Sequence, residues 1–343
     1  MDSASDKRYM LRAIQLAWNG LGHVSPNPMV GCVVVVDGKI IGEGYHQKYG
    51  GPHAEVNAIN SVVDKSQLRE ATVYVTLEPC SHHGKTPPCA DLLISHQVKR
   101  VVVAAGDPNP LVNGNGIEKL RAAGVEVDSG LCETEAKEQN IRFNTVFLKN
   151  RPYIILKWAQ TKDGFIARSD YSSKWISHSL SRQMVHKWRT EEDAILIGKN
   201  TAIYDNPRLT SRDWKGKDPL RIVLDRNKAL DKGLNLFTDE KPTLVYTLRS
   251  PEKHQQTAWI QLDESHFLEG LLTDLHERRI QSLIIEGGQT TLQAFIDRGL
   301  WDEARVFIGD NVFNEGISAP KMTNEATSET KILEDRLLTY YNK

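Results

Sequence analysis

Short apolar segments alternate with helix-like segments along most of the chain, and this alternation restricts the fold more than any other feature. Segments 71–78 and 99–105 are rich in β-branched residues, as strands are. Each is followed by a segment in which apolar residues recur at helical spacing, at 89–97 and at 116–124. Strands that alternate with helices favour a largely parallel sheet covered by helices. The sequence therefore predicts an α/β fold.

The alternation occurs in two series, because a basic, proline-containing connector at 147–153 precedes a second set of apolar segments. A chain of 343 residues also exceeds the usual size of one hydrophobic core. We therefore predict two domains, residues 1–149 and residues 150–343. The first is expected to begin with a helix at 7–22 and a hairpin at 29–46. Strands of the second are predicted at 153–160, 193–199, 220–225, 243–247 and 282–288.

The charge balance and the hydropathy narrow the possible partners. Basic and acidic side chains number 43 and 44, which gives a net charge of −1. Proteins that bind long nucleic acids normally carry a basic excess, and this sequence has none. The apolar run that starts at Gly31 is too short to cross a bilayer, and the first ten residues lack the apolar core of a signal peptide. We expect a cytoplasmic protein that binds neither nucleic acid nor membrane, whereas a small phosphorylated ligand needs only a few local cations.

One histidine and two cysteines of the first domain have the residue types of a zinc site. His53 begins a predicted helix, Cys80 follows a strand and Cys89 opens a helix, with eight residues between the two cysteines. Three protein ligands leave one tetrahedral position for water, as in a catalytic zinc site. Glu55, two residues after His53, is placed to exchange protons with that water. Zinc deaminases share this combination of H-x-E with a later P-C and a further cysteine.

Other interpretations of these residues stay open at this point. His53 and Glu55 could simply begin a surface helix, and the cysteines could be an unrelated pair. His82 and His83 are further ligands by residue type alone. A deaminase that edits nucleic acid would share the same pattern, and salt-sensitive binding to RNA or single-stranded DNA would support it.

The second domain contains a strand-to-helix turn with the features of a phosphate site. In SLIIEGGQTTLQAF, from residue 282 to 295, an apolar strand leads to Glu286, two glycines and a helix that opens with hydroxyl residues. Gly287 and Gly288 allow a ligand to approach the backbone closely, and the free N–H groups of a helix N-terminus bind phosphate. The G-x-G-x-x-G fingerprint of dinucleotide-binding folds does not follow any predicted strand.

Longer stretches resemble one family. In the first domain these are PNPMVGCVVV, HAEVNAI, VTLEPCSHHGKTPPCADLL and DPNPLVNGNGI, and in the second YIILKWAQTKDGFIA, SSKWIS, HKWRTEEDAILIGKNTAIYDNPRLTSR and RIVLD. They closely resemble the deaminase and reductase domains of the bifunctional riboflavin-biosynthesis proteins. The resemblance implies a cytidine-deaminase-like three-layer sandwich followed by a dihydrofolate-reductase-like domain. It also implies zinc and NADPH as cofactors.

The resemblance further implies roles for individual residues. Zinc would be bound by His53, Cys80 and Cys89, with Glu55 transferring protons. The deaminase substrate would contact Asn27, His46, Lys85 and Asn109. The reacting sugar carbon would be surrounded by Lys157, Asp205 and Glu286, and the substrate would be lined by Ser173, Arg189, Leu209, Arg212 and Glu286, with the two arginines at its phosphate. NADPH would contact Ala159, Trp175, Thr201 and Asp205, and its pyrophosphate would lie along Gly288, Gln289, Thr290, Thr291, Leu292, Gln293 and Ala294.

The activity implied is hydrolytic deamination of a phosphorylated diaminopyrimidine, followed by NADPH-dependent reduction of its ribosyl group to ribityl. The sequence does not rank Lys157, Asp205 and Glu286 in the reduction. Arg226, which follows the strand at 220–225, is a candidate for the extra phosphate of NADPH. A protein in which only the deaminase works is the alternative within the family. The oligomeric state is open, a homo-oligomer included.

Overall fold

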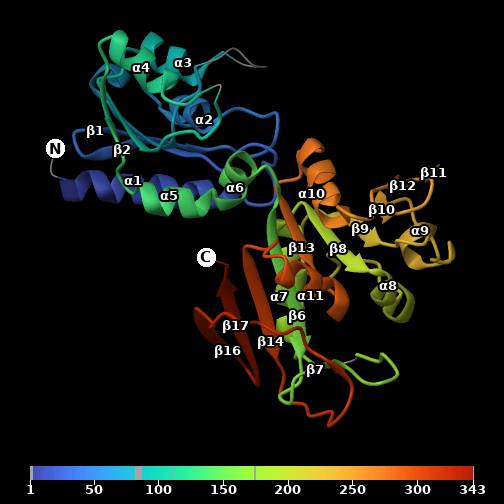
Figure 1. The fold of residues 1–343 in the computed structure, drawn as a ribbon. Helices are drawn as coiled ribbons and strands as arrows, with labels where there is room; N and C mark the ends of the chain where they lie inside the picture. Colours follow the sequence, from blue (N-terminus) through green and yellow to red (C-terminus); the bar gives the residue numbers. More distant parts are fainter. Residues whose placement is uncertain (1–2, 82–86, 111, 174, 343) are drawn as a thin grey trace. The chain divides into compact units, whose positions relative to one another are not determined.

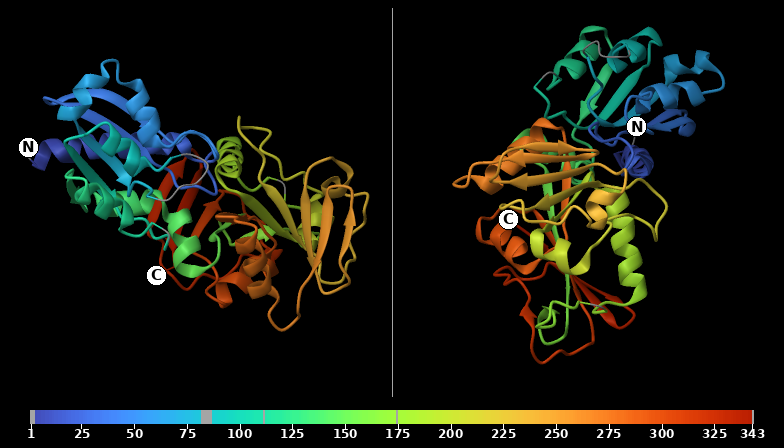
Figure 2. Two further views of the ribbon diagram at one scale, coloured as in Figure 1. Left: turned by 90° about the horizontal axis from the view of Figure 1, so that it is seen from above. Right: turned by 90° about the vertical axis from the view of Figure 1, so that its right-hand side faces the viewer.

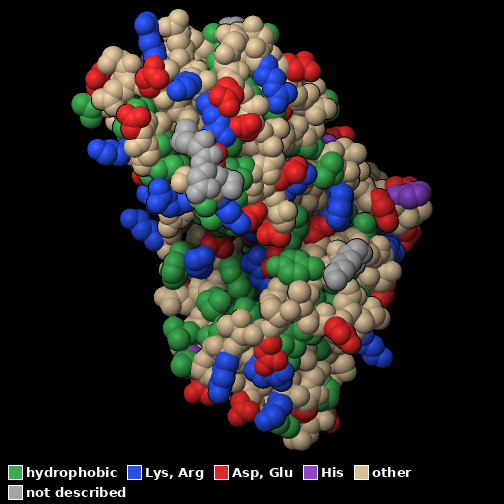
Figure 3. Space-filling model, turned by 90° about the vertical axis from the view of Figure 1, so that its left-hand side faces the viewer, with side chains coloured by type: hydrophobic (Ala, Val, Ile, Leu, Met, Phe, Trp, Pro, Cys, Tyr) green, Lys and Arg blue, Asp and Glu red, His purple; other side chains and the backbone are tan. Residues whose placement is uncertain are grey.

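The computed structural model describes residues 3–81, 87–110, 112–173 and 175–342. The chain divides into two compact units, Met1–Asn150 and Arg151–Lys343, each built on its own sheet (Figure 1). None of the helices in the described part of the chain has both the length and the apolar character needed to cross a bilayer. Basic and acidic side chains are interspersed on the face of the molecule seen in Figure 3.

Unit 1 contains the helix and the hairpin that the sequence predicts at its start. Its helices are α1 (Ser3–Ala17), the 3-10 helix η1 (Trp18–Gly20), α2 (Ala54–Ser61), the 3-10 helix η2 (Lys65–Glu70), α3 (Cys89–Ser95), α4 (Asn115–Ala122), α5 (Glu133–Gln139) and α6 (Ile141–Lys149). Its strands are β1 (Gly31–Val36), β2 (Lys39–Tyr45), β3 (Thr72–Leu77), β4 (Arg100–Ala105) and β5 (Glu126–Ser129). The hairpin turns at Asp37 and Gly38, both with positive φ, as tight two-residue hairpin turns require.

The sheet of unit 1 has the strand order β2-β1-β3-β4-β5, with β3, β4 and β5 parallel. Successive side chains of a strand point to opposite faces, so Cys32 and Val34 pack on one side of the sheet while Val33 and Val35 pack on the other. Helices α2, α3 and α4 cover the first face, and α1, α5 and α6 cover the second (Figure 1). Unit 1 is therefore a three-layer sandwich.

Unit 2 contains all five strands predicted for it, together with others. Its helices are α7 (Ser179–Glu191), α8 (Lys199–Asp205), α9 (Asn235–Thr238), α10 (Phe267–Glu277) and α11 (Gln289–Asp297). Its strands are β6 (Tyr153–Gln160), β7 (Phe165–Ala167), β8 (Ala194–Gly198), β9 (Leu220–Leu224), β10 (Thr243–Thr247), β11 (Glu252–His254), β12 (Thr257–Gln261), β13 (Ser282–Ile285), β14 (Glu303–Ile308), β15 (Ile317–Ser318), β16 (Ser328–Ile332) and β17 (Asp335–Tyr341).

The main sheet of unit 2 has the order β11-β12-β10-β9-β8-β13-β6-β14-β17-β16 and is parallel from β12 to β14. In β6, Ile154 and Leu156 pack beneath α10 and α11, whereas Tyr153 and Ile155 pack beneath α7 (Figures 1 and 2). Helices therefore cover both faces, as expected for a sheet of continuous apolar strands.

The antiparallel strands β16 and β17 lie in a region where the sequence suggests no structure. Strand β16 is the edge strand, and four of its five residues are exposed, so it carries no apolar alternation. Strand β17 pairs with β14 through its backbone, and its inward residues include Asp335 as well as Leu337. Because half of its buried positions are polar, hydrophobic periodicity could not identify this strand.

Candidate active sites

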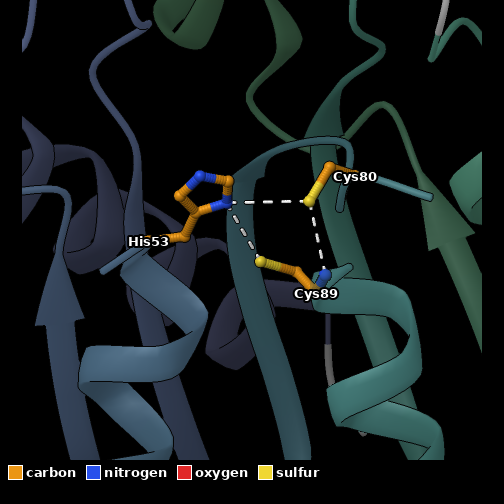
Figure 4. Close-up of side chains that lie close together, drawn as sticks. All are labelled: His53, Cys80 and Cys89. Carbon is orange, nitrogen blue, oxygen red and sulfur yellow. Dashed lines mark hydrogen bonds between the residues drawn. The ribbon is translucent and has the colours of Figure 1, made fainter. Parts of the chain in front are cut away.

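His53, Cys80 and Cys89 come together at one end of the unit 1 sheet (Figure 4). His53 is the N-cap residue of α2, Cys89 is the first residue of α3, and Cys80 follows β3 after a short loop. The His53 Nδ1 atom lies 3.2 Å from the Cys89 Sγ atom and 3.6 Å from the Cys80 Sγ atom. All three ligand atoms lie within 4.8 Å of one another. One histidine nitrogen and two cysteine sulfurs gathered this closely could hold a single metal ion.

Local hydrogen bonds favour the thiolate form of Cys80. The hydrogen bond from Cys89 lowers the pKa of Cys80 to about 4, and His53 acts in the same direction. The backbone N–H of Cys89 also donates to the Cys80 sulfur, at 3.3 Å. The hydrogen bond to Cys80 and burial raise the pKa of Cys89. Zinc prefers cysteine sulfur and histidine nitrogen, so the donor set fits zinc, and zinc binding would release the proton of Cys89.

Glu55 lies in the first turn of α2 beside the three ligands and is almost completely buried. Burial raises the pKa of Glu55 to about 6, and the negative charge of Cys80 acts in the same direction. A carboxyl group with a pKa near neutrality can both accept and release a proton under physiological conditions. The position predicted from the H-x-E pattern therefore has the electrostatics of a proton-transfer group.

His46 and Asn27 lie next to this cluster and fix each other's orientation. The Nδ1 atom of His46 is 2.9 Å from the Pro52 carbonyl oxygen, so this nitrogen must carry a proton and donate it. The Nε2 atom then accepts from the Asn27 side-chain amide, at 3.0 Å. Burial lowers the pKa of His46, which favours this neutral tautomer. The His46 ring meets the His53 ring edge to face, with 5.5 Å between their centroids.

The loop that carries Asn109 is held against the zinc-ligand loop by Glu78, which the sequence interpretation did not single out. Glu78 is buried, and its carboxylate accepts hydrogen bonds from the backbone N–H groups of Gly114 and Gly116, each at 2.9 Å. A glutamate directly before Pro-Cys in a candidate metal loop was the signal that could have identified it. Lys85, His82 and His83 lie outside the described residues.

Unit 2 contains a cavity of about 1180 Å³. The predicted reductase residues that line it are Lys157, Ala159, Ser173, Trp175, Arg189, Thr201, Asp205, Leu209, Arg212, Glu286, Gly288, Gln289, Thr290, Thr291, Leu292 and Ala294. Among the predicted residues that the structure describes in this unit, Gln293 alone does not line it. The amide of Gln293 instead donates to Asp297 Oδ1 at 2.7 Å and accepts from the backbone of Lys321 at 2.8 Å. The tertiary structure thus gathers nearly the whole predicted set around one space.

Glu286 lies in this cavity between two cations. Both carboxylate oxygens accept from the Arg189 guanidinium at 2.8 Å, and Lys157 Nζ lies 3.8 Å from Oε2. Burial by itself would raise the pKa of Glu286, but the charges of Arg189 and Lys157 outweigh it and lower the pKa to about 2. Burial lowers the pKa of Lys157 below its ordinary value of 10.5, although Glu286 opposes this shift. Glu286 therefore stays ionised, while Lys157 is a cation that gives up its proton more readily than a solvated lysine.

Arg189 and His186 of α7 also hold the loop that carries Leu209 and Arg212. The Thr210 carbonyl oxygen accepts from Arg189 Nη1 at 2.9 Å and from the His186 ring at 3.0 Å. Leu209 is buried against this support, whereas the Arg212 side chain is 58% exposed. Every nitrogen of the Arg189 guanidinium thus has a protein partner, and Arg212 is the more accessible of the two predicted phosphate-binding arginines.

The loop between β7 and α7 reaches the same cavity and is tied to α8. The Ser173 hydroxyl donates to Asp205 Oδ1 at 3.3 Å, and the Tyr171 ring stacks on the Tyr204 ring with 4.1 Å between their centroids. Trp175, 61% exposed, lies beneath the Arg182 guanidinium. These contacts bring predicted substrate and cofactor residues from separate segments to one wall of the cavity.

The phosphate-site turn predicted after β13 opens into the cavity as well. Gly288 is the N-cap residue of α11, and the helix continues for nine residues from Gln289 to Asp297. Gly287 and Gly288 lie next to Thr201, whose Oγ1 atom would be 3.1 Å from a side chain added at Gly288. Farther along the wall, Arg226 pairs with Glu264 at 2.9 Å and lies over the Phe267 ring. The cavity therefore combines a helix N-terminus with exposed cationic groups.

The fold and the two sites define an enzyme that joins a zinc-binding deaminase domain to a reductase domain. Residues 3–105 match the family described as cytidine and deoxycytidylate deaminase zinc-binding region. Residues 152–323 match the RibD C-terminal domain. The chain belongs to the RibD family of riboflavin biosynthesis proteins. The predicted fold class and the two enzyme activities, deamination and reduction, are thereby confirmed.

Individual relatives match over nearly the whole chain. The riboflavin biosynthesis protein RibD of Aquifex aeolicus is 46% identical, and the match covers 91% of this chain and 89% of that protein. The crystal structure of a diaminohydroxyphosphoribosylaminopyrimidine deaminase/5-amino-6-(5-phosphoribosylamino)uracil reductase from Thermotoga maritima has a TM-score of 0.91 at 39% identity, with 99% of each chain covered. RibD of Acinetobacter baumannii has a TM-score of 0.90 at 35% identity, with each chain covered completely.

Proposed function

We propose that residues 1–149 deaminate the phosphoribosylated diaminopyrimidine and that residues 150–343 reduce the ribosyl group of the product with NADPH. The observation that carries the proposal is a complete set of reacting groups in each unit. Unit 1 joins a His-Cys-Cys donor set to a buried glutamate. Unit 2 joins a lysine whose side chain is 15% exposed to a cavity that opens on a helix N-terminus.

In the deaminase site, His53, Cys80 and Cys89 would hold a zinc ion, which would supply the Lewis acidity that makes water nucleophilic near neutral pH. Glu55 accepts a proton from the water and passes it to the neighbouring ring nitrogen. The water oxygen forms a bond to the ring carbon, and the carbon–nitrogen bond to the exocyclic amine breaks. Glu55 transfers the second proton of the water to the departing amine, which leaves as ammonia. The raised pKa of Glu55 suits it to each of these transfers.

Asn27, His46 and Asn109 are proposed to hold the pyrimidine and its ribose, with Lys85 at the phosphate. The support for this role is the pairing of His46 with Asn27 beside the zinc ligands. Because the His46 Nδ1 proton is committed to Pro52, the ring cannot turn without breaking that hydrogen bond. The Asn27 amide is therefore held in one orientation, and its oxygen is left for a donor on the substrate.

In the reductase site, the cavity of unit 2 would hold NADPH, which would supply a hydride to C1′ of the sugar. The C1′–O4′ bond breaks, and O4′ takes a proton. Lys157 is a better proton donor than Glu286, because Arg189 holds Glu286 as a carboxylate. Glu286 in turn keeps Lys157 charged. Asp205, which accepts from Ser173, is proposed to orient the nicotinamide amide or the sugar.

NADPH is proposed to place its pyrophosphate at the start of α11, between Gly288 and Ala294, with Ala159, Trp175 and Thr201 along the nicotinamide half. The substrate is proposed to lie against Ser173, Leu209 and Glu286, with its phosphate at Arg212 and Arg189. The exposed guanidinium of Arg212 supports this placement more directly than that of Arg189, which acts chiefly on Glu286.

One assay tests both halves of the proposal. The purified protein is incubated with zinc, the diaminopyrimidine substrate and NADPH, while ammonia release and NADPH oxidation are followed together. We expect ammonia to appear first and NADPH oxidation to require the deaminated product. Ammonia release without any NADPH oxidation, even when the deaminated product is supplied, would leave only the deaminase active.

Loss of zinc is expected to abolish ammonia release and to spare NADPH oxidation on the preformed deaminated substrate, because the ligands all lie in unit 1. Cys89→Ser should reduce the bound zinc and the deaminase rate together, since a serine hydroxyl is a poor zinc ligand. Zinc content and both rates are measured. Cys132→Ser, which changes a cysteine outside the cluster, is the matched control. Full deaminase activity in a zinc-free preparation would contradict the proposal.

Arg226→Ala is expected to raise KM for NADPH by about tenfold and to leave KM for NADH unchanged, on the scale of one charge-assisted hydrogen bond to phosphate. The guanidinium is half exposed, and its partner Glu264 is 77% exposed. Such an exposed ion pair contributes little to the stability of the protein, so a phosphate can replace Glu264 as the partner of Arg226 with little loss of free energy. Steady-state kinetics with both cofactors measure the effect, and Arg249→Ala is the control. Equal changes in KM for NADPH and NADH would show that Arg226 does not bind the extra (2′) phosphate of NADPH.

Two expectations from the sequence, the cellular location and the oligomeric state, stay predictions. A cytoplasmic location is expected, and cell fractionation would test it. A homo-oligomer is compatible with the sequence, and light scattering of the purified protein would give its mass in solution.

A further inference from the structure

Glu78, two residues before the candidate zinc ligand Cys80, accepts hydrogen bonds from four backbone N–H groups. Its carboxylate accepts backbone hydrogen bonds at 2.9 to 3.4 Å, and its side chain is almost completely buried. The donors are the N–H groups of Asp107, Gly114, Gly116 and Ile117. All of them belong to the segment from 106 to 117, between β4 and the first turn of α4.

These hydrogen bonds stabilise both the Glu78 carboxylate and the backbone N–H groups that donate to it. A buried carboxylate is costly unless hydrogen bonds replace its hydration, and the first N–H groups of a helix lack partners within the helix. Three of the donors belong to the N-cap and first turn of α4, where the helix dipole also favours a negative charge. Glu78 therefore caps α4 from a distant part of the sequence. The same carboxylate also binds the backbone of Asp107, shortly after β4.

The same segment packs directly on the peptide that precedes Cys80. A side chain added at Gly116 would lie 1.9 Å from the Pro79 carbonyl oxygen, so only glycine permits this approach. Glu78 is itself anchored to β4, because its backbone N–H donates to the Ala105 carbonyl oxygen at 3.0 Å. The backbone that leads to the candidate zinc ligand Cys80 is thus held against Asp107 and the first turn of α4.

Asn109 lies in a turn within this segment. The Asn109 N–H donates to Asp107 Oδ1 at 2.8 Å, and the Asn109 carbonyl oxygen accepts from Val112 at 2.9 Å. The Asp107 N–H is one of the donors to Glu78. A continuous series of contacts therefore leads from the residue two positions before Cys80 to the turn of Asn109.

We propose that Glu78 is a positioning residue of the deaminase site, which sets the place of Asn109 relative to the zinc ligand Cys80. The inference rests on the proposed role of Asn109 in holding the substrate. In this view Glu78 contributes to catalysis only through Asn109. Its removal should displace the substrate without releasing the metal.

Glu78→Gln tests the proposal with little change in size. The glutamine amide keeps one acceptor oxygen. Its NH₂ group replaces the other oxygen, and because NH₂ is a donor it cannot accept from the backbone N–H groups that this oxygen bound. We expect kcat/KM for deamination to fall about 10- to 100-fold, mainly through KM, as for other residues that support a catalytic shell. Bound zinc and the reductase rate on the deaminated substrate should be unchanged. Glu118→Gln, an exposed glutamate of the same helix α4, is the matched control.

A double-mutant cycle with Asn109→Ala distinguishes positioning from a general structural role. If Glu78 acts through Asn109, Glu78→Gln should reduce kcat/KM less than about threefold in the Asn109→Ala background. Gly116→Ala, which forces the segment away from Pro79, should reproduce the loss and decides the matter if Glu78→Gln fails to fold. Additive effects in the cycle, or loss of zinc from Glu78→Gln, would overturn the inference. Full activity of Asn109→Ala would instead contradict the proposed role of Asn109.

Discussion

Glu55→Gln is expected to lower the rate of ammonia release about 100- to 10,000-fold, the usual contribution of a general acid–base group. Glutamine has the size of glutamate but cannot take a proton from water or return one to the departing amine. The residue is buried in the first turn of α2, so the change leaves the surface of unit 1 unaltered. Ammonia release is measured with the diaminopyrimidine substrate, and zinc content is measured in the same preparation.

The reductase of the same chain serves as an internal control for Glu55→Gln. NADPH oxidation on preformed deaminated substrate should keep the wild-type rate, because Glu55 and the cavity of unit 2 belong to different units. Glu70→Gln, which changes an exposed glutamate of unit 1, should leave both rates unchanged. Loss of both activities in Glu55→Gln would contradict two separable sites, and retention of ammonia release would assign the proton transfers to another group.

Lys157→Met is expected to produce the opposite result, a loss of about 100- to 10,000-fold in NADPH oxidation with normal ammonia release. Methionine has a similar length and is tolerated in a buried position, but it cannot protonate the ring oxygen of the sugar. Glu286 retains its two hydrogen bonds to Arg189, so the cavity keeps an ionised carboxylate. The loss should appear in kcat, and fluorescence titration should show that NADPH still binds.

The pH dependence of the wild-type reductase gives a second measure of Lys157. The protonated amine is the active form, so the rate should fall as pH rises through the pKa of Lys157. Burial lowers this pKa below 10.5, and the decline should therefore begin at a lower pH than for a solvated lysine. Lys162→Met, an exposed lysine that pairs with Asp310, is the matched control. A wild-type kcat in Lys157→Met would show that the proton comes from elsewhere.

Much of the fold could be predicted because it depends on local patterns. Strands β6, β8, β9, β10 and β13 are short, continuous apolar runs in the sequence. The turn at Asp37 and Gly38 has residues that tolerate positive φ. By contrast, β16 and β17 are held by backbone pairing at an edge, where β16 has a single apolar residue and a buried polar residue, Asp335, opens β17. Strands of that kind are recognised only when their partners are known.

The candidate sites divide in the same way. The candidate zinc ligands, which the structure brings together, and Glu55 could be singled out because their residue types and order are typical of one chemistry. Glu78 was missed, since its role depends on N–H groups that lie up to 39 positions away in the sequence. Its position directly before Pro-Cys draws attention to Glu78, but nothing in the sequence shows that it caps α4, because the usual N-cap is adjacent to the helix it stabilises.

The sequence by itself determined the class of chemistry, because the choice of His, Cys, Glu and Lys at given intervals limits which metal, proton and phosphate reactions are possible. Only the tertiary structure decided the protonation states. Arg189 and Glu286 are 97 positions apart, yet their contact lowers the pKa of Glu286 to about 2, and this is why we propose Lys157 as the proton donor. Electrostatic interactions depend on distance and burial in space, and neither quantity can be read from the order of residues along the chain.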